Sequence, residues 1–122
     1  MNALRSLVPL LPVRRVPASI AFYEKLGFRV GNTFVPPDET EPSWAWLASE
    51  NGAQLMVGRA ESAARPFEEL LLYVYVDDVE AKRSELVSAG IEAGEIARPF
   101  YAPRGEFRIV DPDGYGLMIT HT

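Results

Sequence analysis

The stretch "VRRVPASIAFYEKLGFRVG" at residues 13–31 has a counterpart later in the chain. It aligns with "VDDVEAKRSELVSAGIEAG" at residues 76–94, where valines, an alanine and two glycines recur at matching places. A second pair follows in the same order, "NGAQLMV" at 51–57 and "DGYGLMI" at 113–119. Turn glycines and strand patterns that repeat in the same order indicate duplication. We therefore expect two half-size copies of one unit.

Each copy is predicted to contain a strand, a helix and three further strands. Pro17 suits the first turn of the first helix and Gly27 suits its end, while Asp78 is the expected N-cap of the second helix. The first copy should have a strand at 7–13, a helix at 17–26, and strands near 28–35, 43–49 and 53–59. The second should have a strand at 71–77, a helix at 79–89, and strands near 92–98, 105–110 and 115–121.

These elements predict one domain, residues 1–122, made of two repeats. The first repeat spans about 1–58 and the second about 69–122, with a linker at about 59–68. Prolines in the strand at 7–13 place it at a sheet edge, because proline cannot donate to a neighbouring strand. The acidic, proline-rich segment at 36–42 is predicted to be an exposed loop.

The amino-acid composition excludes several classes of binding partner and functional site. The chain has 12 Lys and Arg against 17 Asp and Glu, a formal net charge of −5, which argues against a nucleic-acid partner. It has no cysteine, which excludes disulfides, thiolate metal sites and a cysteine nucleophile. The first residues, "MNALRSLVPLLPVRR", are too short and too interrupted by proline for a membrane span. We expect a cytoplasmic protein with no membrane partner.

The repeat, together with "SIAFYEKLGF" at 19–28 and "EFRIVDPDGYGLMI" at 106–119, resembles the vicinal oxygen chelate superfamily of glyoxalase I, extradiol dioxygenases and bleomycin-resistance proteins. The bleomycin-resistance branch is the most similar, because "SLVPLLPVRRVPASIAFYEKLGF" at 6–28 and "RGEFRIVDPDG" at 104–114 follow its pattern. The resemblance covers nearly the whole chain. It implies an α+β fold of two βαβββ modules whose curved mixed sheets surround a concave cavity.

Metal-using relatives place one ligand on the first strand and one on the last strand of each module, typically His, Gln or Glu. The resemblance puts these positions at Val8 and Met56, and at Leu71 and Met118. All four are apolar, and a thioether is too soft to replace imidazole or oxygen ligands. Gln54, on the same strand face as Met56, is the one nearby side chain that could coordinate. We expect no metal or other cofactor and an apolar cavity wall at these positions, with simple core packing as the alternative.

Aromatic residues are the candidates for ligand contact. Strand alternation puts Leu71, Tyr73 and Tyr75 on one face, and Trp44 and Trp46 on one face of another strand. Such rings suit a flat heteroaromatic or amphipathic ligand, and packing of a curved sheet or a subunit interface is the alternative. The predicted ligand-binding residues are Trp44, Trp46, Met56, Leu71, Tyr73, Tyr75, Phe100, Tyr101 and Met118.

Phe100 and Tyr101 enter this set through the resemblance. They lie in "RPFYAPRG" at 98–105, where bleomycin-resistance proteins have a loop near the binding groove. The segment departs from the usual proline-tryptophan-glycine pattern, so the ligand is not assigned from it.

Acidic residues could attract a cationic ligand if they surround the groove. Asp38, Glu39 and Glu41 cluster in one loop, and Glu68 and Glu69 precede the strand with the tyrosines. Long-range fields of this kind raise the local concentration of a cation. An ordinary solvated acidic surface is the alternative reading.

No residue makes a catalytic centre by itself. His121, the single histidine, is expected to be a frayed terminal side chain, and Ser19 has no histidine near it in sequence. Asp111 and Asp113 are expected to bond to N–H groups of their own turn. Arg104 or Arg108 could meet a carboxylate across strands.

Three functions remain open. The preferred one is a metal-free binding protein that sequesters a hydrophobic, aromatic or cationic molecule such as a glycopeptide antibiotic, as bleomycin-resistance proteins do. The alternatives are a divalent-metal-dependent glyoxalase- or dioxygenase-type enzyme with displaced ligands, and a fold used only for dimerisation or partner contact. The resemblance also implies a homodimer with its cavity at or near the subunit interface, sometimes with the N-terminal strand exchanged. A monomer that encloses the cavity with its own two modules is the alternative.

Overall fold

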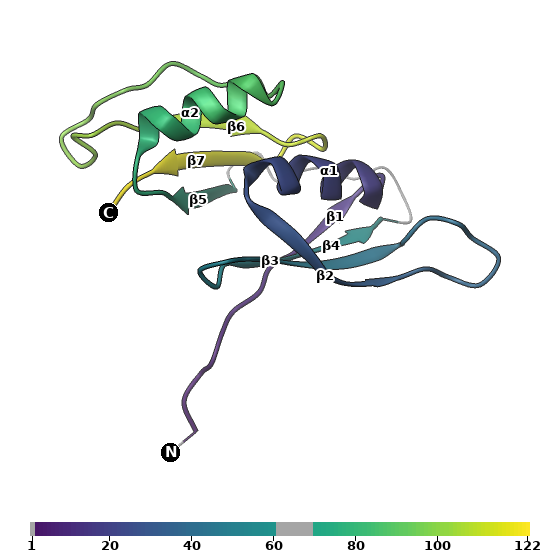
Figure 1. Cartoon of the computed structure of the whole chain (residues 1–122). Helices are drawn as coiled ribbons and strands as arrows, with labels where there is room; N and C mark the ends of the chain where they lie inside the picture. Colours follow the sequence, from purple (N-terminus) through teal and green to yellow (C-terminus); the bar gives the residue numbers. More distant parts are fainter. Residues whose placement is uncertain (1, 61–69) are drawn as a thin grey trace. The chain divides into compact units, whose positions relative to one another are not determined.

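The chain folds into two compact units, residues 1–64 and 65–122 (Figure 1). The computed structural model describes residues 2–60 and 70–122. The first unit contains β1 (Leu10–Val13), α1 (Val16–Leu26), β2 (Phe28–Phe34), β3 (Trp44–Ser49) and β4 (Gln54–Arg59). The second contains β5 (Leu71–Tyr75), α2 (Val79–Ser88), β6 (Phe107–Val110) and β7 (Gly116–Thr120).

Both units combine a helix with an open mixed sheet. The first sheet has the order β1-β4-β3-β2, in which β1 runs parallel to β4 and the other neighbours are antiparallel. The second has the order β5-β7-β6, with β5 parallel and β6 antiparallel to β7. The proline-containing strand β1 lies at a sheet edge, as its composition predicts. These arrangements confirm the predicted α+β class.

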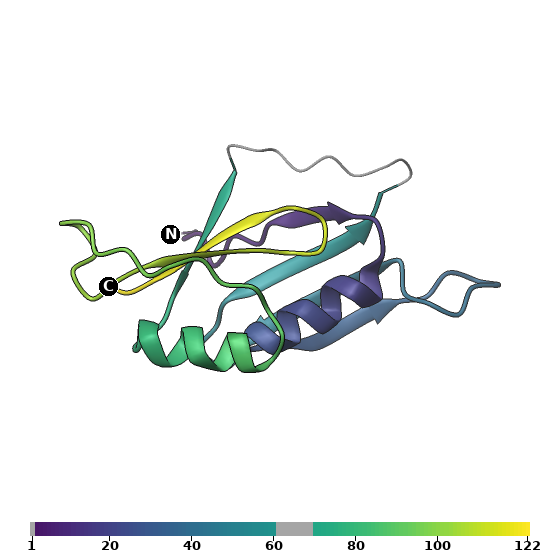
Figure 2. The same cartoon turned by 90° about the horizontal axis from the view of Figure 1, so that it is seen from above.

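Strand alternation sorts the first sheet into two faces. One face packs against α1, which lies across this sheet in Figure 2 and buries Val16, Tyr23 and Leu26. The strand residues on that face are almost fully buried: Leu11, Val13, Ala45, Leu47, Leu55 and Val57. Burying each valine or leucine of this set stabilises the unit by about 1.5–3 kcal/mol. No other helix is found among the described residues of this unit, so none of its helices covers the opposite face.

The second unit repeats this pattern with fewer strands. Phe107, Ile109, Leu117 and Ile119 alternate along β6 and β7 and are almost fully buried. The helix α2 buries Val79 and Leu86. Asp78 caps α2, because its Oδ1 accepts a hydrogen bond of 2.9 Å from the Ala81 N–H, which confirms the predicted N-cap.

The strand predicted near residues 92–98 is wrong. The described structure has only an isolated bridge there, between Ala97 and Glu106, and a bond from the Gly94 N–H to the Arg108 carbonyl. The Arg83 guanidinium of α2 donates to the carbonyls of Ala93 and Gly94 at 3.0 and 2.8 Å. Side-chain donors on α2 therefore take carbonyls that a strand neighbour would otherwise bind.

The start of the first strand also differs from prediction, because β1 begins at Leu10 rather than at residue 7. The strand β4 ends at Arg59, as predicted for the strand near 53–59. The Ala60 N–H still bonds to the Val13 carbonyl, so this residue also belongs to the first unit. The rest of the predicted linker, residues 61–68, lies outside the described residues. Among the described residues, neither helix has the length and apolar character needed to cross a membrane.

Asp111 organises the turn that leads into β7. Its Oδ1 accepts hydrogen bonds of 2.9 Å from the N–H groups of Asp113 and Tyr115, as predicted for this turn. The Asp111 side chain is buried, so its removal leaves two N–H groups without their acceptor.

We expect Asp111→Ala to lower the free energy of unfolding by about 1–3 kcal/mol, because buried donors that lose an acceptor cost about that much. Urea denaturation followed by circular dichroism measures this change. Asp77→Ala, at an exposed position, is the control and should change stability by less than about 0.5 kcal/mol. Equal effects from both variants would contradict this role for Asp111.

Candidate functional site

The sheet face opposite α1, which we call the first open face, gathers apolar and aromatic side chains. Cross-strand register places Leu10 beside Met56 and Met56 beside Trp46, so these three form one row across β1, β4 and β3. Trp44 lies two residues from Trp46 on the same face, opposite Gly58. The structure thus places Trp44, Trp46 and Met56, the residues of the first unit predicted to contact a ligand, on one sheet face.

Trp46 is held in place by two contacts. A Cβ atom placed on Gly31 would lie 2.2 Å from Cε3 of the indole, so the ring packs directly on the glycine backbone. Its Nε1–H donates a 3.1 Å hydrogen bond to Oε1 of Gln54. The sheet register shifts between Val30 and Asn32, at Gly31, which lies where the indole approaches the strand. The indole is therefore held at two edges, by Gly31 at the Cε3–Cζ3 edge and by Gln54 at the N–H.

The corresponding surface of the second unit, the second open face, carries tyrosines. Tyr73, Met118 and Arg108 form a row across β5, β7 and β6. The Tyr73 and Tyr75 side chains are exposed and their ring centroids are 6.3 Å apart. Leu71, opposite Gly116, lies two residues before Tyr73 on this face.

Phe100 and Tyr101 lie in a turn before β6. Phe100 is 95% exposed, and its ring meets the Tyr101 ring edge to face with centroids 5.4 Å apart. The Tyr101 hydroxyl donates a 3.0 Å hydrogen bond to Oε1 of Glu106. This bond and the charge of Glu106 raise the pKa of the Tyr101 phenol, and burial and the nearby Tyr73 add to the shift. Tyr101 therefore lies beside the second open face.

Gly31, Glu106 and Arg108 were not among the residues predicted to contribute to these faces. For Glu106 and Arg108, the sequence contains one relevant signal. Both alternate along the strand with the apolar residues Phe107 and Ile109, so they point to the opposite face. The burial of Glu106 has no signal in the neighbouring sequence.

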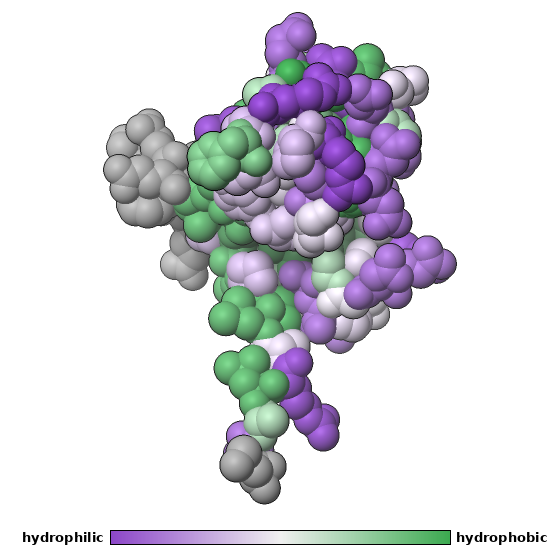
Figure 3. Space-filling view, turned by 90° about the vertical axis from the view of Figure 1, so that its left-hand side faces the viewer, coloured by the Kyte–Doolittle hydropathy of each residue, from purple (hydrophilic) through white to green (hydrophobic). Residues whose placement is uncertain are grey.

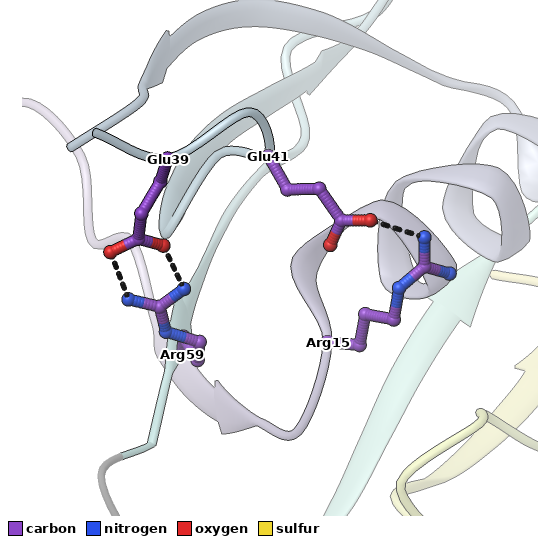
Figure 4. Close-up of polar contacts among 4 residues, drawn as sticks. All are labelled: Arg15, Glu39, Glu41 and Arg59. Carbon is purple, nitrogen blue, oxygen red and sulfur yellow. Dashed lines mark hydrogen bonds and ion pairs between the residues drawn. The ribbon is translucent and has the colours of Figure 1, made fainter. Parts of the chain in front are cut away.

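The acidic loop does not offer free carboxylates at Glu39 and Glu41 (Figure 4). Arg59 binds Glu39 through two contacts of 2.6 and 3.2 Å, and Arg15 binds Glu41 at 2.6 Å. These hydrogen bonds from arginine hold the pKa of both carboxyls below the usual range. Both pairs are partly exposed and contribute little stability. Their charges are compensated locally, which weakens the loop as an attractor of cations.

The other two acidic residues considered for such a role, Glu68 and Glu69, lie outside the described residues. Asp38 adopts a left-handed backbone conformation in the loop, with φ of 68°. A single aspartate in a turn does not make a binding site for a cation.

The side chains at the four positions that the resemblance assigns to metal ligands do not fit a divalent metal. Val8 precedes β1, so its predicted place on the first strand is wrong and Leu10 is the residue opposite Met56. Leu71 and Met118 add a hydrocarbon and a thioether, neither of them a hard donor. The amide oxygen of Gln54 already accepts from Trp46. Across residues 2–60 and 70–122, no three His, Cys, Asp or Glu side chains are grouped as a metal site requires.

The prediction that His121 is a frayed terminal side chain is wrong. The residue is buried, with 9% of its surface exposed. Its Nε2 accepts a 3.0 Å hydrogen bond from the Arg104 N–H, and its Nδ1 lies 2.8 Å from Arg104 Nη2. The Arg104 guanidinium also donates to the main-chain oxygen of Thr122. Arg104 therefore contacts an imidazole and a main-chain oxygen, and no described ion pair joins Arg104 or Arg108 to a carboxylate. These contacts tie the end of β7 to the loop before β6.

Comparison with solved structures finds the same fold in binding proteins. TnmS3, an antibiotic binding protein from Streptomyces sp. CB03234, is 19% identical with a TM-score of 0.78, covering 99% of this chain and 98% of that one. A bleomycin resistance determinant encoded on transposon Tn5 is 21% identical with a TM-score of 0.75, covering 98% of each chain. No curated protein matches the chain.

A third neighbour is the bleomycin-binding protein from bleomycin-producing Streptomyces verticillus, complexed with copper(II)-bleomycin. It is 21% identical with a TM-score of 0.71, covering 100% of this chain and 99% of that one. At these identities the likeness shows the fold. A family profile matches residues 5–119, and the chain therefore belongs to the Glyoxalase/Bleomycin resistance protein/Dioxygenase superfamily.

Proposed function

We propose that this protein binds and sequesters a small aromatic or cationic molecule, such as a glycopeptide antibiotic, without a metal ion. Ligand contact is assigned to the two open faces. Trp44, Trp46 and Met56 supply the first face, and Leu71, Tyr73, Tyr75 and Met118 supply the second, with Phe100 and Tyr101 beside it.

The observation that carries this proposal is the fixed position of Trp46. An indole that packs on Gly31 and bonds to Gln54 loses little rotamer freedom when a ligand stacks on it. Binding surfaces that are ordered before the ligand arrives avoid the entropy cost of ordering side chains on binding. Aromatic rings with a polar edge also provide broad apolar contact together with orientation.

The fold comparisons support a binding function of this kind. Two of the neighbours are named for binding bleomycin or for resistance to it, and a third for binding an antibiotic. Binding without a metal ion is also supported by the side chains at the family's four metal-ligand positions, which are hydrocarbon and thioether groups. Metal-dependent catalysis of the glyoxalase or dioxygenase type would need harder donors than these.

The test uses acridine, a flat heteroaromatic probe, and isothermal titration calorimetry with and without a chelator. We expect acridine to bind the wild-type protein equally well in both conditions. Trp46→Leu should weaken binding about 10-fold, because it removes the fixed aromatic surface. Phe22→Leu is the matched control, since Phe22 lies half-buried on α1 on the other side of the sheet.

Two outcomes would contradict the proposed function. If acridine gave no binding heat and did not shift the melting temperature, the aromatic face would not be a binding surface. Binding that disappears on chelation would favour the metal-dependent alternative.

Gly31→Ala tests whether the position of Trp46 matters. The added methyl group overlaps the indole, so we expect unfolding free energy to fall by about 1–3 kcal/mol and acridine to bind more weakly. Gly94→Ala is the control, because a Cβ there meets its nearest atom at an ordinary 3.4 Å. Unchanged acridine affinity in a folded Gly31→Ala protein would show that the packing on Gly31 does not matter for binding.

We also propose that the protein works as a homodimer. Apolar side chains at Leu4, Leu7 and Leu10 are exposed, and Figure 3 shows hydrophobic residues along this N-terminal segment at the bottom of the view. A second copy that covers these leucines would remove them from water.

The dimer proposal predicts a dimeric mass by light scattering coupled to size-exclusion chromatography. Replacing Leu4 and Leu7 together by serine should shift the mass toward the monomer, because it removes the apolar contact. Val87→Ser, at an exposed position on α2, should leave the mass unchanged. A wild-type protein that is monomeric at the same concentration would refute the proposal.

A further inference from the structure

Glu106 has a position unusual for a glutamate. Its main chain pairs with Ala97 through two hydrogen bonds of 2.9 Å, immediately before β6 begins. Phe107 and Ile109 face the core of the second unit, so strand alternation directs Glu106 toward the second open face, as it does Arg108. The residue is nevertheless only 5% exposed.

The carboxylate of Glu106 is incompletely satisfied. Its Oε1 accepts from the Tyr101 hydroxyl at 3.0 Å. Its Oε2 is buried and has no hydrogen-bond partner within the part of the chain that the structure describes. Burial of a charged oxygen without a partner is unfavourable, and a donor from outside the chain would remove this cost.

Arg108 does not supply the missing donor. Its guanidinium lies over Gly116 on β7, where a Cβ atom would come within 2.5 Å of Nη2. The described ion pairs of the second unit, such as Arg98 with Glu80, leave Glu106 out. The second oxygen of Glu106 therefore has no cationic partner among the described residues.

We propose that Glu106 anchors a positively charged, N–H-donating group of a planar aromatic ligand, of the amidinium or aminopyridinium class. This inference rests on the proposed binding function and names the chemistry that the second open face selects. A charged N–H donor forms a stronger bond with a carboxylate than a phenol does. Aromatic rings around the anchor attract the same cation through their faces.

Such a ligand must displace the Tyr101 hydroxyl from its hydrogen bond to Glu106. Its ring is exposed and lies in a turn, and its one described hydrogen bond is to Glu106. A forked cation such as an amidinium can take both carboxylate oxygens, replacing the Tyr101 hydroxyl at Oε1 and filling Oε2. The phenol then remains free to cover the bound ligand from the side.

The test compares naphthamidine with naphthamide, which have the same shape and differ in charge. We expect the wild-type protein to bind naphthamidine about 10-fold more tightly or better, as a bond to a charged group predicts. Glu106→Gln should bring this ratio close to one while naphthamide affinity stays within about 2-fold. Glu95→Gln removes the same charge from an exposed position of the second unit and should keep the ratio.

A second measurement uses the wild-type protein alone, so it does not depend on the folding of Glu106→Gln. The hydrogen bond to Glu106 is the largest cause of the raised pKa of Tyr101. Saturating naphthamidine should lower this pKa toward its ordinary value, whereas naphthamide should not. Titration of carbon-13-labelled tyrosine by NMR, with Tyr101→Phe to assign the signal, reads this shift.

The outcomes separate this inference from the proposed function. If both probes bind and Glu106→Gln leaves their ratio unchanged, or the pKa of Tyr101 responds equally to both, Glu106 is not the anchor and the binding function stands. If neither probe binds the wild-type protein, the inference is overturned, and acridine binding then shows separately whether the proposed function survives.

Discussion

Period-two alternation along the strands is the constraint on which the rest of the structure depends. Ala45 and Leu47 must face α1 to be buried, so their neighbours Trp44 and Trp46 must face away from it. The same rule turns Tyr73 and Met118 away from the buried residues Ile119 and Leu117. A one-residue slip of register would exchange the two faces and place tryptophan and arginine in the core. Core packing and the composition of the open faces are therefore consequences of one pattern.

The two open faces use polar groups in different ways. On the first face, the Trp46 N–H donates its hydrogen bond to the Gln54 oxygen. This bond orients the indole and leaves its apolar ring surface available. On the second face, Tyr101 satisfies one oxygen of Glu106 and the other oxygen has no described partner. A satisfied polar pair orients a side chain, whereas a buried unsatisfied oxygen favours an external donor. Under the proposed function, the first face would select a ligand by shape and the second would select one by charge.

Electrostatics shows why charge read from sequence misleads. The acidic loop at 36–42 carries three carboxylates, but Arg15 and Arg59 come from distant parts of the first unit to pair with two of them. Glu106, by contrast, lies in a stretch with arginines on both sides and still lacks a cationic partner in the described structure. Net charge and local clustering describe the surface average. The pairing of individual groups depends on contacts between residues far apart in the chain.

Local pattern was enough to predict most elements of the fold. Alternation, Pro17, Gly27 and the Asp78 cap located the helices and nearly all strands, because these signals act within a few residues. They failed at residues 92–98, where Arg83 from α2 binds the carbonyls of Ala93 and Gly94, and at His121, which a loop residue buries. Both depend on partners that no local window contains.

The same division holds for the candidate site. Which aromatic residues share a strand face follows from the sequence, since parity needs no knowledge of the neighbouring strands. That Trp46 packs on Gly31, and that Glu106 is buried with a free oxygen beside Tyr101, follows only from the folded chain. Periodicity is a property of consecutive residues, whereas close packing and hydrogen-bond satisfaction are properties of atoms that folding brings together.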